Sequence, residues 1–357
     1  MGTKTFGLDI GATTIKAVWF SKQNDAFSLV AASVMPTPSK GMLSESPLDQ
    51  EEMAHAIKNI VAEAKIGTSY VNVALPENQV YTRVLEMPVL SDKELSSAIY
   101  WEAEQYIPVP LSNIVLDWKV LSRPLPSETD KKMQVFLVGA PTMLINKYQK
   151  ILEMSGLIPS SVETEILSAI RALVFSGEKK QDDKKKEEKS SFPNSLIMNI
   201  GAVNTSLAIV RNGIIIFTYS IQTGGSAINR AIASDFGFTT VQAEEYKKIY
   251  GYSSKDFGGK IGKASKPILE SIMTEIKKAI AFYSEKYKGD TPITQILLCG
   301  GTARLPGLGL FFAENCGIET AVANPWRTLK NQQLPKELLD NASDYTIAAG
   351  LAMKNYE

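Results

Sequence analysis

Hydrophobic positions along the chain follow two different periods, which predict an alternation of strands and helices. Short apolar runs end in glycine, as in FGLDIG (6–11) and LIMNIG (196–201), and are typical of buried strands. The segment 51–64 repeats its apolar residues at helical spacing instead. A second helical stripe within 267–287 consists of Ile268, Ile272, Ile276, Ala279, Ile280 and Tyr283. We interpret this stripe as core packing, and the mixture of periods predicts an α/β fold.

One pattern occurs twice and suggests a duplicated unit. LDIGATTIKAVWF (8–20) and MNIGAVNTSLAIV (198–210) both contain an apolar strand, Ile-Gly-Ala, a small polar turn and a second strand. In the second copy, Asn212-Gly213 predicts a tight type I′ hairpin into a third strand. In the first copy, SKQND separates the second strand from AFSLVAASV. We expect two α/β lobes whose glycine turns face one another across a cleft.

A break in composition lies between the two copies. The segment EKKQDDKKKEEK (178–189) is almost wholly charged and has no apolar residue to bury, so we expect a disordered connector over 177–193. A basic arm for nucleic acid is the competing interpretation, but the interleaved Asp and Glu residues cancel its charge. Lys+Arg and Asp+Glu both number 38 in the chain, so no net field favours a nucleic-acid partner.

The composition also argues against several classes of chemistry. The length of 357 residues predicts more than one domain. The single histidine, His55, falls off the apolar face of 51–64; we expect a solvated residue and neither a Ser-His-Asp triad nor a multi-histidine metal site. Cys299 and Cys316 form no disulfide or metal-spacing pattern, which is typical of a reducing compartment. With no evident signal peptide or run of about 18 apolar residues, we expect a cytoplasmic protein that reaches a membrane through a partner.

Both glycine turns are candidates for phosphate binding. Gly11 and Gly201 allow a close backbone approach, and the small residues after them offer N–H and hydroxyl donors. Lys16 could add positive charge, and Asp9 could hold a hydrated magnesium ion. A third turn follows the apolar strand of ITQILLCGGTARLPGL (293–308), where two glycines could leave room for a flat adenine. Ordinary hairpin turns and a plain strand-to-helix loop are the alternatives.

In this order the three turns resemble the phosphate-1, phosphate-2 and adenosine motifs of the actin/Hsp70/FtsA superfamily. SVETEILSAIRAL (161–173) resembles the first connecting helix, with Glu165 at its acidic position, and SDYTIAAGLAMK (343–354) resembles the second. QAEEYKKIYG (242–251) resembles the helix that holds ribose and adenine. The resemblance implies a site for ATP or ADP, with Mg²⁺ at Asp9, made of Asp9, Gly11, Ala12, Thr13, Thr14, Lys16, Asn199, Gly201, Ala202, Asn204, Gly224, Gly225, Glu244, Lys247, Gly300, Gly301, Thr302 and Arg304.

Within this superfamily the chain is similar to the PilM family of type IV pilus assembly proteins. The most specific segment is 85–118, particularly EAEQYIPVPL (102–111); GGTARLPGL and ANPWRTL are similar as well. Physically, the segment begins as a helix with Ser91 as N-cap and Glu94 closing a capping box. Pro108 and Pro110 stop the helix, and IVLDWKVL returns as a strand.

The family resemblance implies a two-lobed, actin-like (FtsA-like) fold of duplicated mixed-sheet domains with an inserted 1C subdomain. Subdomain 1A would take residues 1–77 and 144–176, and 1C would take 78–143. After the connector, subdomain 2A would take 194–228 and 291–357, and 2B would take 229–290.

The same resemblance implies a cytoplasmic, nucleotide-binding scaffold rather than an enzyme. The scaffold would bind the N-terminal tail of the inner-membrane protein PilN in a cleft between 1A and 1C. Other alignment-complex proteins of the type IV pilus and a homo-oligomer are further implied partners. We expect the tail to contact Glu102, Gln105 and Tyr106; the alternative is that Tyr106 packs only within 1C.

One departure from the superfamily pattern concerns catalysis. The second phosphate turn usually begins with Asp, but Asn199 stands there and brings no negative charge to hydrated Mg²⁺. We therefore expect ATP binding with little or no hydrolysis, and some turnover in Asn199→Asp. Glu165 could polarise a water or be only a helix-end carboxylate. An actin-fold kinase or ATPase, and a filament-forming protein like FtsA or MreB, are the alternatives, although no acidic base for a kinase acceptor is identifiable.

Overall fold

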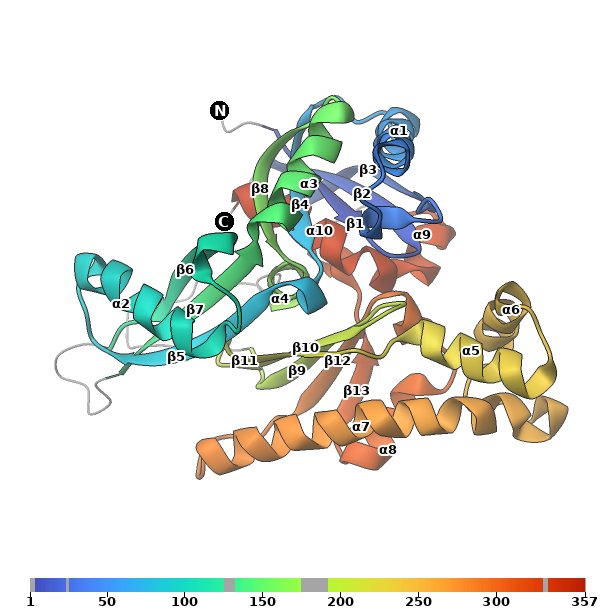
Figure 1. Cartoon of the computed structure of the whole chain (residues 1–357). Coiled ribbons are helices and arrows are strands. Elements are labelled where there is room, and N and C mark those ends of the chain that lie inside the picture. Colours follow the sequence, from blue (N-terminus) through green and yellow to red (C-terminus); the bar gives the residue numbers. More distant parts are fainter. Residues whose placement is uncertain (1–3, 24–25, 125–131, 175–191, 330–332, 357) are drawn as a thin grey trace.

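The first lobe is built on a five-stranded mixed sheet (Figure 1). The computed structural model describes residues 4–23, 26–124, 132–174, 192–329 and 333–356. The sheet has the order β3-β2-β1-β4-β8 and consists of Phe6–Ile10 (β1), Thr14–Gln23 (β2), Ala26–Pro36 (β3), Tyr70–Leu75 (β4) and Ile158–Thr164 (β8). β1 pairs antiparallel with β2 and parallel with β4, and β4 pairs parallel with β8. The sheet therefore has an antiparallel half, formed by β1, β2 and β3, and a parallel half, formed by β1, β4 and β8.

The second lobe repeats this arrangement. Its sheet has the order β11-β10-β9-β12-β13 and consists of Ser195–Ile200 (β9), Thr205–Arg211 (β10), Ile214–Ile221 (β11), Gln295–Cys299 (β12) and Glu319–Val322 (β13). β9 pairs antiparallel with β10 and parallel with β12, as β1 does with β2 and β4. Between β10 and β11, Asn212 and Gly213 both have positive φ, 51° and 79°, as the predicted type I′ hairpin requires. The predicted duplication is confirmed.

A third, antiparallel sheet is inserted into the first lobe between β4 and β8. It has the order β5-β7-β6 and consists of Tyr81–Pro88 (β5), Ile114–Ser122 (β6) and Lys132–Pro141 (β7). Helix α2 (Asp92–Tyr106) packs on it through Leu95, Ile99 and Ala103. The expected capping box of Ser91 and Glu94 is present, and the helix ends before Pro108. The subdomain boundaries stated above stay a prediction.

Two helices tie the lobes together. α4 (Glu165–Val174) directly follows β8, and α10 (Thr346–Met353) packs on β1 although it follows the second sheet in the chain. α4 and α10 pack so closely that a Cβ on Gly350 would lie 1.9 Å from the Ser168 carbonyl oxygen. One hydrophobic cluster includes Ile166 and Ile170 of α4 together with Ile197 of β9. The lobes therefore share a core rather than being joined by a linker alone.

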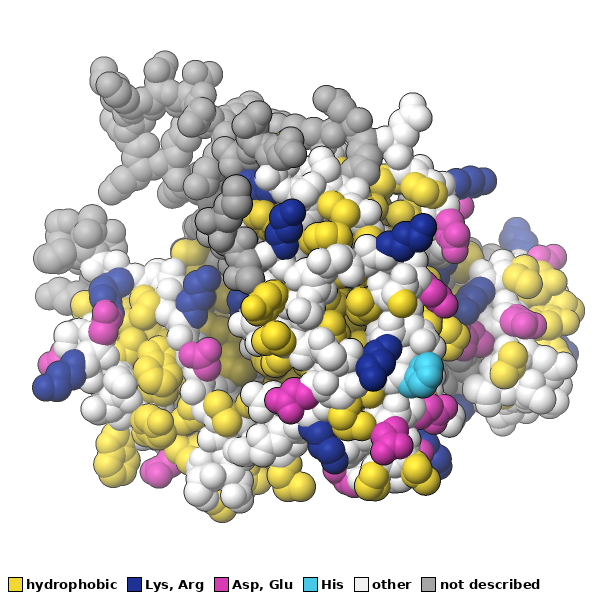
Figure 2. Space-filling model, turned by 90° about the horizontal axis from the view of Figure 1, so that it is seen from above, with side chains coloured by type: hydrophobic (Ala, Val, Ile, Leu, Met, Phe, Trp, Pro, Cys, Tyr) yellow, Lys and Arg dark blue, Asp and Glu magenta, His cyan; other side chains and the backbone are white. Residues whose placement is uncertain are grey.

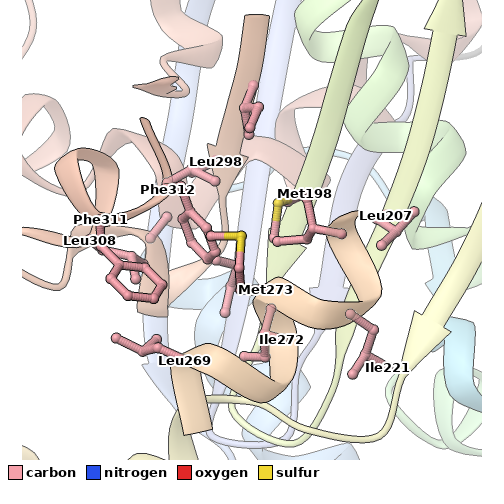
Figure 3. Close-up of a cluster of buried hydrophobic side chains, with 14 of the residues drawn as sticks. Met198, Leu207, Ile221, Leu269, Ile272, Met273, Leu298, Leu308, Phe311 and Phe312 are labelled. Atoms are coloured by element: carbon pink, nitrogen blue, oxygen red, sulfur yellow. The ribbon is translucent and has the colours of Figure 1, made fainter. Parts of the chain in front are cut away.

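The remaining helices cover the sheets. In the first lobe, α1 (Pro47–Glu63) and α3 (Thr142–Met154) contribute Met53, Ile57 and Tyr148 to one cluster. In the second lobe, α7 (Lys260–Lys286) places Leu269, Ile272 and Met273 against strand residues and against α8 (Leu308–Cys316), as Figure 3 shows. α5 (Gly225–Phe236) and α6 (Thr240–Tyr250) lie at the right-hand end in Figure 1, and α9 spans Lys336–Asp340. The stripe in 267–287 is thus confirmed as core packing.

Two details of the sequence expectations have an outcome in the described residues. The segment 161–173 is not a helix throughout, because residues 161–164 complete strand β8 and the helix begins at Glu165. His55 is exposed on α1, as expected. The charged segment 178–189 lies outside the described residues.

Candidate functional site

The three glycine turns meet in a cleft between the lobes. They follow β1, β9 and β12, so all three lie at carboxyl ends of strands, the edge where open α/β sheets bind ligands. The cleft has a volume of about 240 Å³. Every residue of the predicted nucleotide site lines it except Gly224, which instead packs against the carbonyl oxygens of Gly201 and Ala202.

The first two turns have the same hydrogen bond at the same spacing. The Gly11 amide donates to the Thr14 carbonyl oxygen at 3.1 Å, and the Gly201 amide donates to the Asn204 carbonyl oxygen at 3.0 Å. A Cβ on Gly11 would lie 2.8 Å from the Thr14 oxygen, so a side chain there would force the turn open. The amides of Gly225 and Ser226 donate to the second turn, so the start of α5 is fixed against it. The two turns therefore have matching geometry, and backbone hydrogen bonds hold each of them.

The third turn packs directly against the second. Gly300 has φ of 85°, and a Cβ on it would lie 2.6 Å from the Asn199 side-chain oxygen. The Thr302 hydroxyl donates to the Gly201 carbonyl oxygen at 3.2 Å. A Cβ on Gly301, by contrast, meets no atom closer than 4.0 Å. Gly301 therefore leaves open space in the cleft.

Carboxylates and one lysine lie where the first lobe meets the cleft. Lys16 Nζ lies 3.6 Å from Asp9 Oδ2 and donates to the Thr14 hydroxyl at 2.7 Å. Burial raises the pKa of Asp9, and Lys16 opposes that rise. Burial, together with repulsion from Asp9 and Glu77, raises the pKa of Glu165 to about 8. The Asn199 amide nitrogen is 3.5 Å from Glu165 Oε2. A neutral Glu165 and a neutral Asn199 thus face each other across the lobes at pH 7.

The second lobe supplies a group of polar side chains from α5 and α6. Lys247 Nζ donates to the Gly225 carbonyl oxygen at 3.3 Å, and burial lowers the pKa of Lys247 to about 8. Glu244 pairs with Lys248 at 2.7 Å. Asn229 of α5 donates to Glu244 Oε2 at 3.4 Å. These contacts hold the two helices together at the cleft edge.

Several cleft residues are absent from the predicted set. They are Val203, Ser226, Asn229, Lys248, Leu305, Asp344 and Ile347, with Glu165 identified only as a connecting-helix residue. Asp344 accepts two 2.8 Å hydrogen bonds from Arg304. Helical spacing could have pointed to Lys248, four residues after Glu244, but only tertiary packing brings Asn229 and Asp344 into the cleft.

A second, mostly apolar cleft lies between the inserted sheet and the first lobe. Its volume is about 600 Å³, and its walls include Val120 of β6, Val138 of β7, Val162 of β8, Leu167 of α4 and Ile214 of β11. Strands β6, β8 and β11 end their sheets, and each pairs with one other strand among the described residues. Figure 2 shows a hollow with hydrophobic side chains between the left-hand end of the molecule and its main body. Edge strands of three sheets therefore converge on one apolar cleft.

The floor of this second cleft is a buried ion network. Glu163 accepts hydrogen bonds from Arg171 Nη2 at 2.9 Å and from the Ser168 hydroxyl at 2.6 Å, and Lys354 Nζ lies 2.9 Å away. Burial alone would raise the pKa of Glu163, but Arg171, Lys354 and Ser168 hold it below its usual range. The network fixes α4 and the end of α10 relative to β8.

The three predicted tail contacts on α2 do not line the apolar cleft. The Arg83 guanidinium lies over the Tyr106 ring, 3.6 Å from its centroid, and both residues line a separate small pocket with Tyr219. Gln105 is exposed and Glu102 is half-buried. Their role in partner binding stays a prediction.

Comparisons with known proteins agree with this architecture. The family described as type IV pilus assembly protein PilM matches residues 7–356. A structure titled PilM-PilN type IV pilus biogenesis complex superposes with TM-score 0.83 at 26% identity, over 99% of both chains. MreB5 of Spiroplasma citri bound to AMPPNP superposes with TM-score 0.53 at 13% identity, over 100% of this chain and 96% of that one, and shows the fold alone.

A curated relative adds a sequence comparison. Cell division protein FtsA of Streptococcus pneumoniae (strain D39) is 24% identical over 89% of this chain and 75% of its own length. The expected two-lobed, actin-like fold is confirmed by these likenesses together with the two repeated sheets. Because the family match covers nearly the whole sequence, the chain belongs to the PilM family of type IV pilus assembly proteins.

Proposed function

We propose that the chain is a nucleotide-binding scaffold of type IV pilus assembly that binds the N-terminal tail of a PilN-like inner-membrane protein. The observation that carries the proposal is the presence of two separate clefts, one polar and lined by three glycine turns, the other apolar and lined by edge strands. The likeness to the PilM-PilN complex supports the partner.

The polar cleft fits a nucleoside triphosphate. A Cβ would lie 2.8 Å from the Thr14 carbonyl oxygen at Gly11 and 3.1 Å from the Asn204 carbonyl oxygen at Gly201, so both turns are tight, and they would hold the phosphates with Lys16. Open space above Gly301 would take the base, beside Lys247. Asn229 Oδ1 is buried in this cleft without a hydrogen-bond partner, as expected of a site that lacks its ligand.

Magnesium would be held through the phosphates and the Asp9 carboxylate. Mg²⁺ in phosphate sites commonly uses one or two carboxylates and keeps several waters. Among the described residues, no group of three or more His, Cys, Asp or Glu side chains could hold a metal alone, so the ion would depend on the nucleotide.

Slow or absent hydrolysis follows from two side chains. Asn199 is neutral, and Glu165 with a pKa of about 8 is mostly protonated at pH 7. A protonated carboxyl cannot accept a proton from water, so neither group would activate a nucleophile. Binding without turnover suits a scaffold better than a kinase.

The nucleotide site is tested with Gly301→Trp. A Cβ on Gly301 meets no atom closer than 4.0 Å, so the added indole would enter the open space where the base is proposed to lie. We expect calorimetry to give ATP affinity for the wild type and at least about tenfold weaker binding for the variant. Leu310→Trp, at an exposed position on α8 outside the cleft, is the matched control. Equal affinity in both Trp variants would overturn the assigned base position.

The apolar cleft is the proposed site for the tail. An extended peptide can add a strand to an exposed sheet edge, and β6 and β8 present such edges with apolar side chains between them. Among the described residues, no helix is long and apolar enough to span a bilayer. Tethering through the tail would place the protein at the inner face of the membrane, where further pilus proteins or a second copy could join it.

The tail site is tested by fluorescence anisotropy with a labelled N-terminal peptide of the PilN-like protein. Val115→Asp places a charge at an exposed apolar position of β6 that lines this cleft and should weaken binding at least about tenfold. The double variant Gln105→Ala, Tyr106→Ala changes the end of α2, outside that cleft, and tests α2 as the alternative binding site for the tail. Loss in the α2 variant alone would place the tail on α2; no binding to the wild type would contradict the scaffold function.

A further inference from the structure

Asn229 has incomplete hydrogen bonding in the polar cleft. The residue lies on α5, is 4% exposed, and its side-chain oxygen Oδ1 is buried without a hydrogen-bond partner. Most buried polar atoms in proteins have a partner, so an orphan acceptor in a binding cleft indicates a donor on the ligand. Four such orphan atoms elsewhere in the described residues, on Gln50, Thr164, Ser220 and Tyr287, do not line this cleft.

The orientation of the Asn229 amide is fixed by Glu244. Its nitrogen donates to Glu244 Oε2 at 3.4 Å, and the flipped amide would place an oxygen against a carboxylate oxygen. Partial burial alone would raise the pKa of Glu244, but Lys248 and Lys247 hold it below its ordinary value. Glu244 is therefore ionised at neutral pH and acts only as an acceptor. The Asn229 oxygen must point away from it.

Two acceptors from neighbouring helices thus line the same part of the cleft, the Asn229 oxygen and the Glu244 carboxylate. A nucleotide carries few hydrogen-bond donors. Its phosphates only accept, while its ribose has two adjacent hydroxyl donors. We propose that Asn229 recognises ribose: its Oδ1 accepts a hydrogen bond from one hydroxyl of the 2′,3′-diol while Glu244 accepts one from the other.

This inference rests on the proposed nucleotide binding and adds a selectivity to it. A site that offers acceptors to a diol rejects analogues without the hydroxyls, because its acceptors then stay unpaired. The cleft should discriminate between ribonucleotides and dideoxynucleotides.

The test combines a protein variant with ATP analogues that lack one or both ribose hydroxyls. ATP, 2′-dATP, 3′-dATP and 2′,3′-ddATP are titrated by calorimetry into the wild type and into Asn229→Ala. Removing the hydroxyl that Asn229 contacts should weaken wild-type binding about 3- to 10-fold, the usual range for one neutral hydrogen bond. The same removal should have almost no effect in Asn229→Ala. Asn315→Ala on α8, whose amide donates to the Phe311 carbonyl oxygen, is the matched control.

The outcomes separate this inference from the function on which it rests. Equal loss of affinity for all four nucleotides in Asn229→Ala would overturn ribose recognition, because a structural role or a contact to the base amine predicts that result. Asn229→Ser, a smaller polar substitution, repeats the test if the alanine variant does not fold. A wild type that binds no ATP at all would contradict the nucleotide site itself.

Discussion

Glu77 is a single side chain held by three parts of the molecule. It is 3% exposed in the segment between β4 and the inserted sheet, accepts a 2.9 Å hydrogen bond from the Thr82 hydroxyl, and lies 3.4 Å from the Ile166 amide at the start of α4. Thr82 in turn contacts Thr218 of the second lobe at 3.1 Å. The carboxyl therefore lies at the junction of both lobes and the inserted sheet, where its charge state affects the stability of the fold.

The protonation of Glu77 predicts a pH-dependent stability. Burial raises its pKa from 4.5 to about 7, so the folded protein binds more protons than the unfolded chain between these values. The stabilising contribution is complete below pH 4.5 and is lost as pH rises through about 7. Glu77→Gln should therefore gain stability relative to wild type between pH 5 and pH 8.5, by about 2 kcal/mol.

Thermal unfolding of both proteins at the two pH values measures this gain. Glu270→Gln, on the exposed face of α7, is the control and should shift the unfolding temperature equally at both pH values. If the difference in unfolding temperature between Glu77→Gln and the wild type did not change with pH, the Glu77 carboxyl would not titrate in this range.

At the scale of elements, local sequence patterns predicted short motifs, but they did not predict how elements distant in the chain meet. The repeated Ile-Gly-Ala turns, the Asn212-Gly213 hairpin and the capping box of α2 depend on a few neighbouring residues, so the sequence alone could reveal them. The apolar cleft depends on three strands that are distant in the chain and meet only in the fold. Asn229 enters its cleft because α5 packs on α6, which no local motif expresses. The sequence therefore indicated the glycine turns that meet in the polar cleft but gave no sign of the apolar cleft, and the expected tail contacts on α2 stay a prediction.

The contact between α4 and α10 gives a prediction at this scale. A Cβ on Gly350 would lie 1.9 Å from the Ser168 carbonyl oxygen, so Gly350→Ala must push the two connecting helices apart. We expect a loss of about 3 kcal/mol in the free energy of unfolding by urea. Gly309→Ala on α8 is the matched control, since its Cβ would have 4.0 Å of clearance, and it should stay within about 1 kcal/mol of wild type. Comparable losses in the two variants would argue against tight helix crossing as the cause.

At the scale of the whole molecule, the two lobes make unequal contributions to the polar cleft. Among the residues that the structure describes, the first lobe supplies the Gly11 turn, Asp9, Lys16 and Glu165, all on the side proposed for the phosphates. The proposed base and ribose groups, including Asn229, Glu244 and Lys247, belong entirely to the second lobe. Only the phosphates would therefore bridge the lobes.

This asymmetry predicts different protection by ATP and by adenosine. In amide hydrogen exchange followed by mass spectrometry, ATP with Mg²⁺ should slow exchange at 11–14 in the first lobe and at 201–204 in the second, because both turns line the cleft where the phosphates are proposed to bind. Adenosine at an equal multiple of its dissociation constant should slow exchange around 225–250 and 300–304 only. Stability should rise with either ligand, by about 2.7 kcal/mol at a hundredfold excess over the dissociation constant. Protection of 11–14 by adenosine would show that the first lobe responds without a phosphate, and absence of protection there by ATP would remove the first lobe from the site.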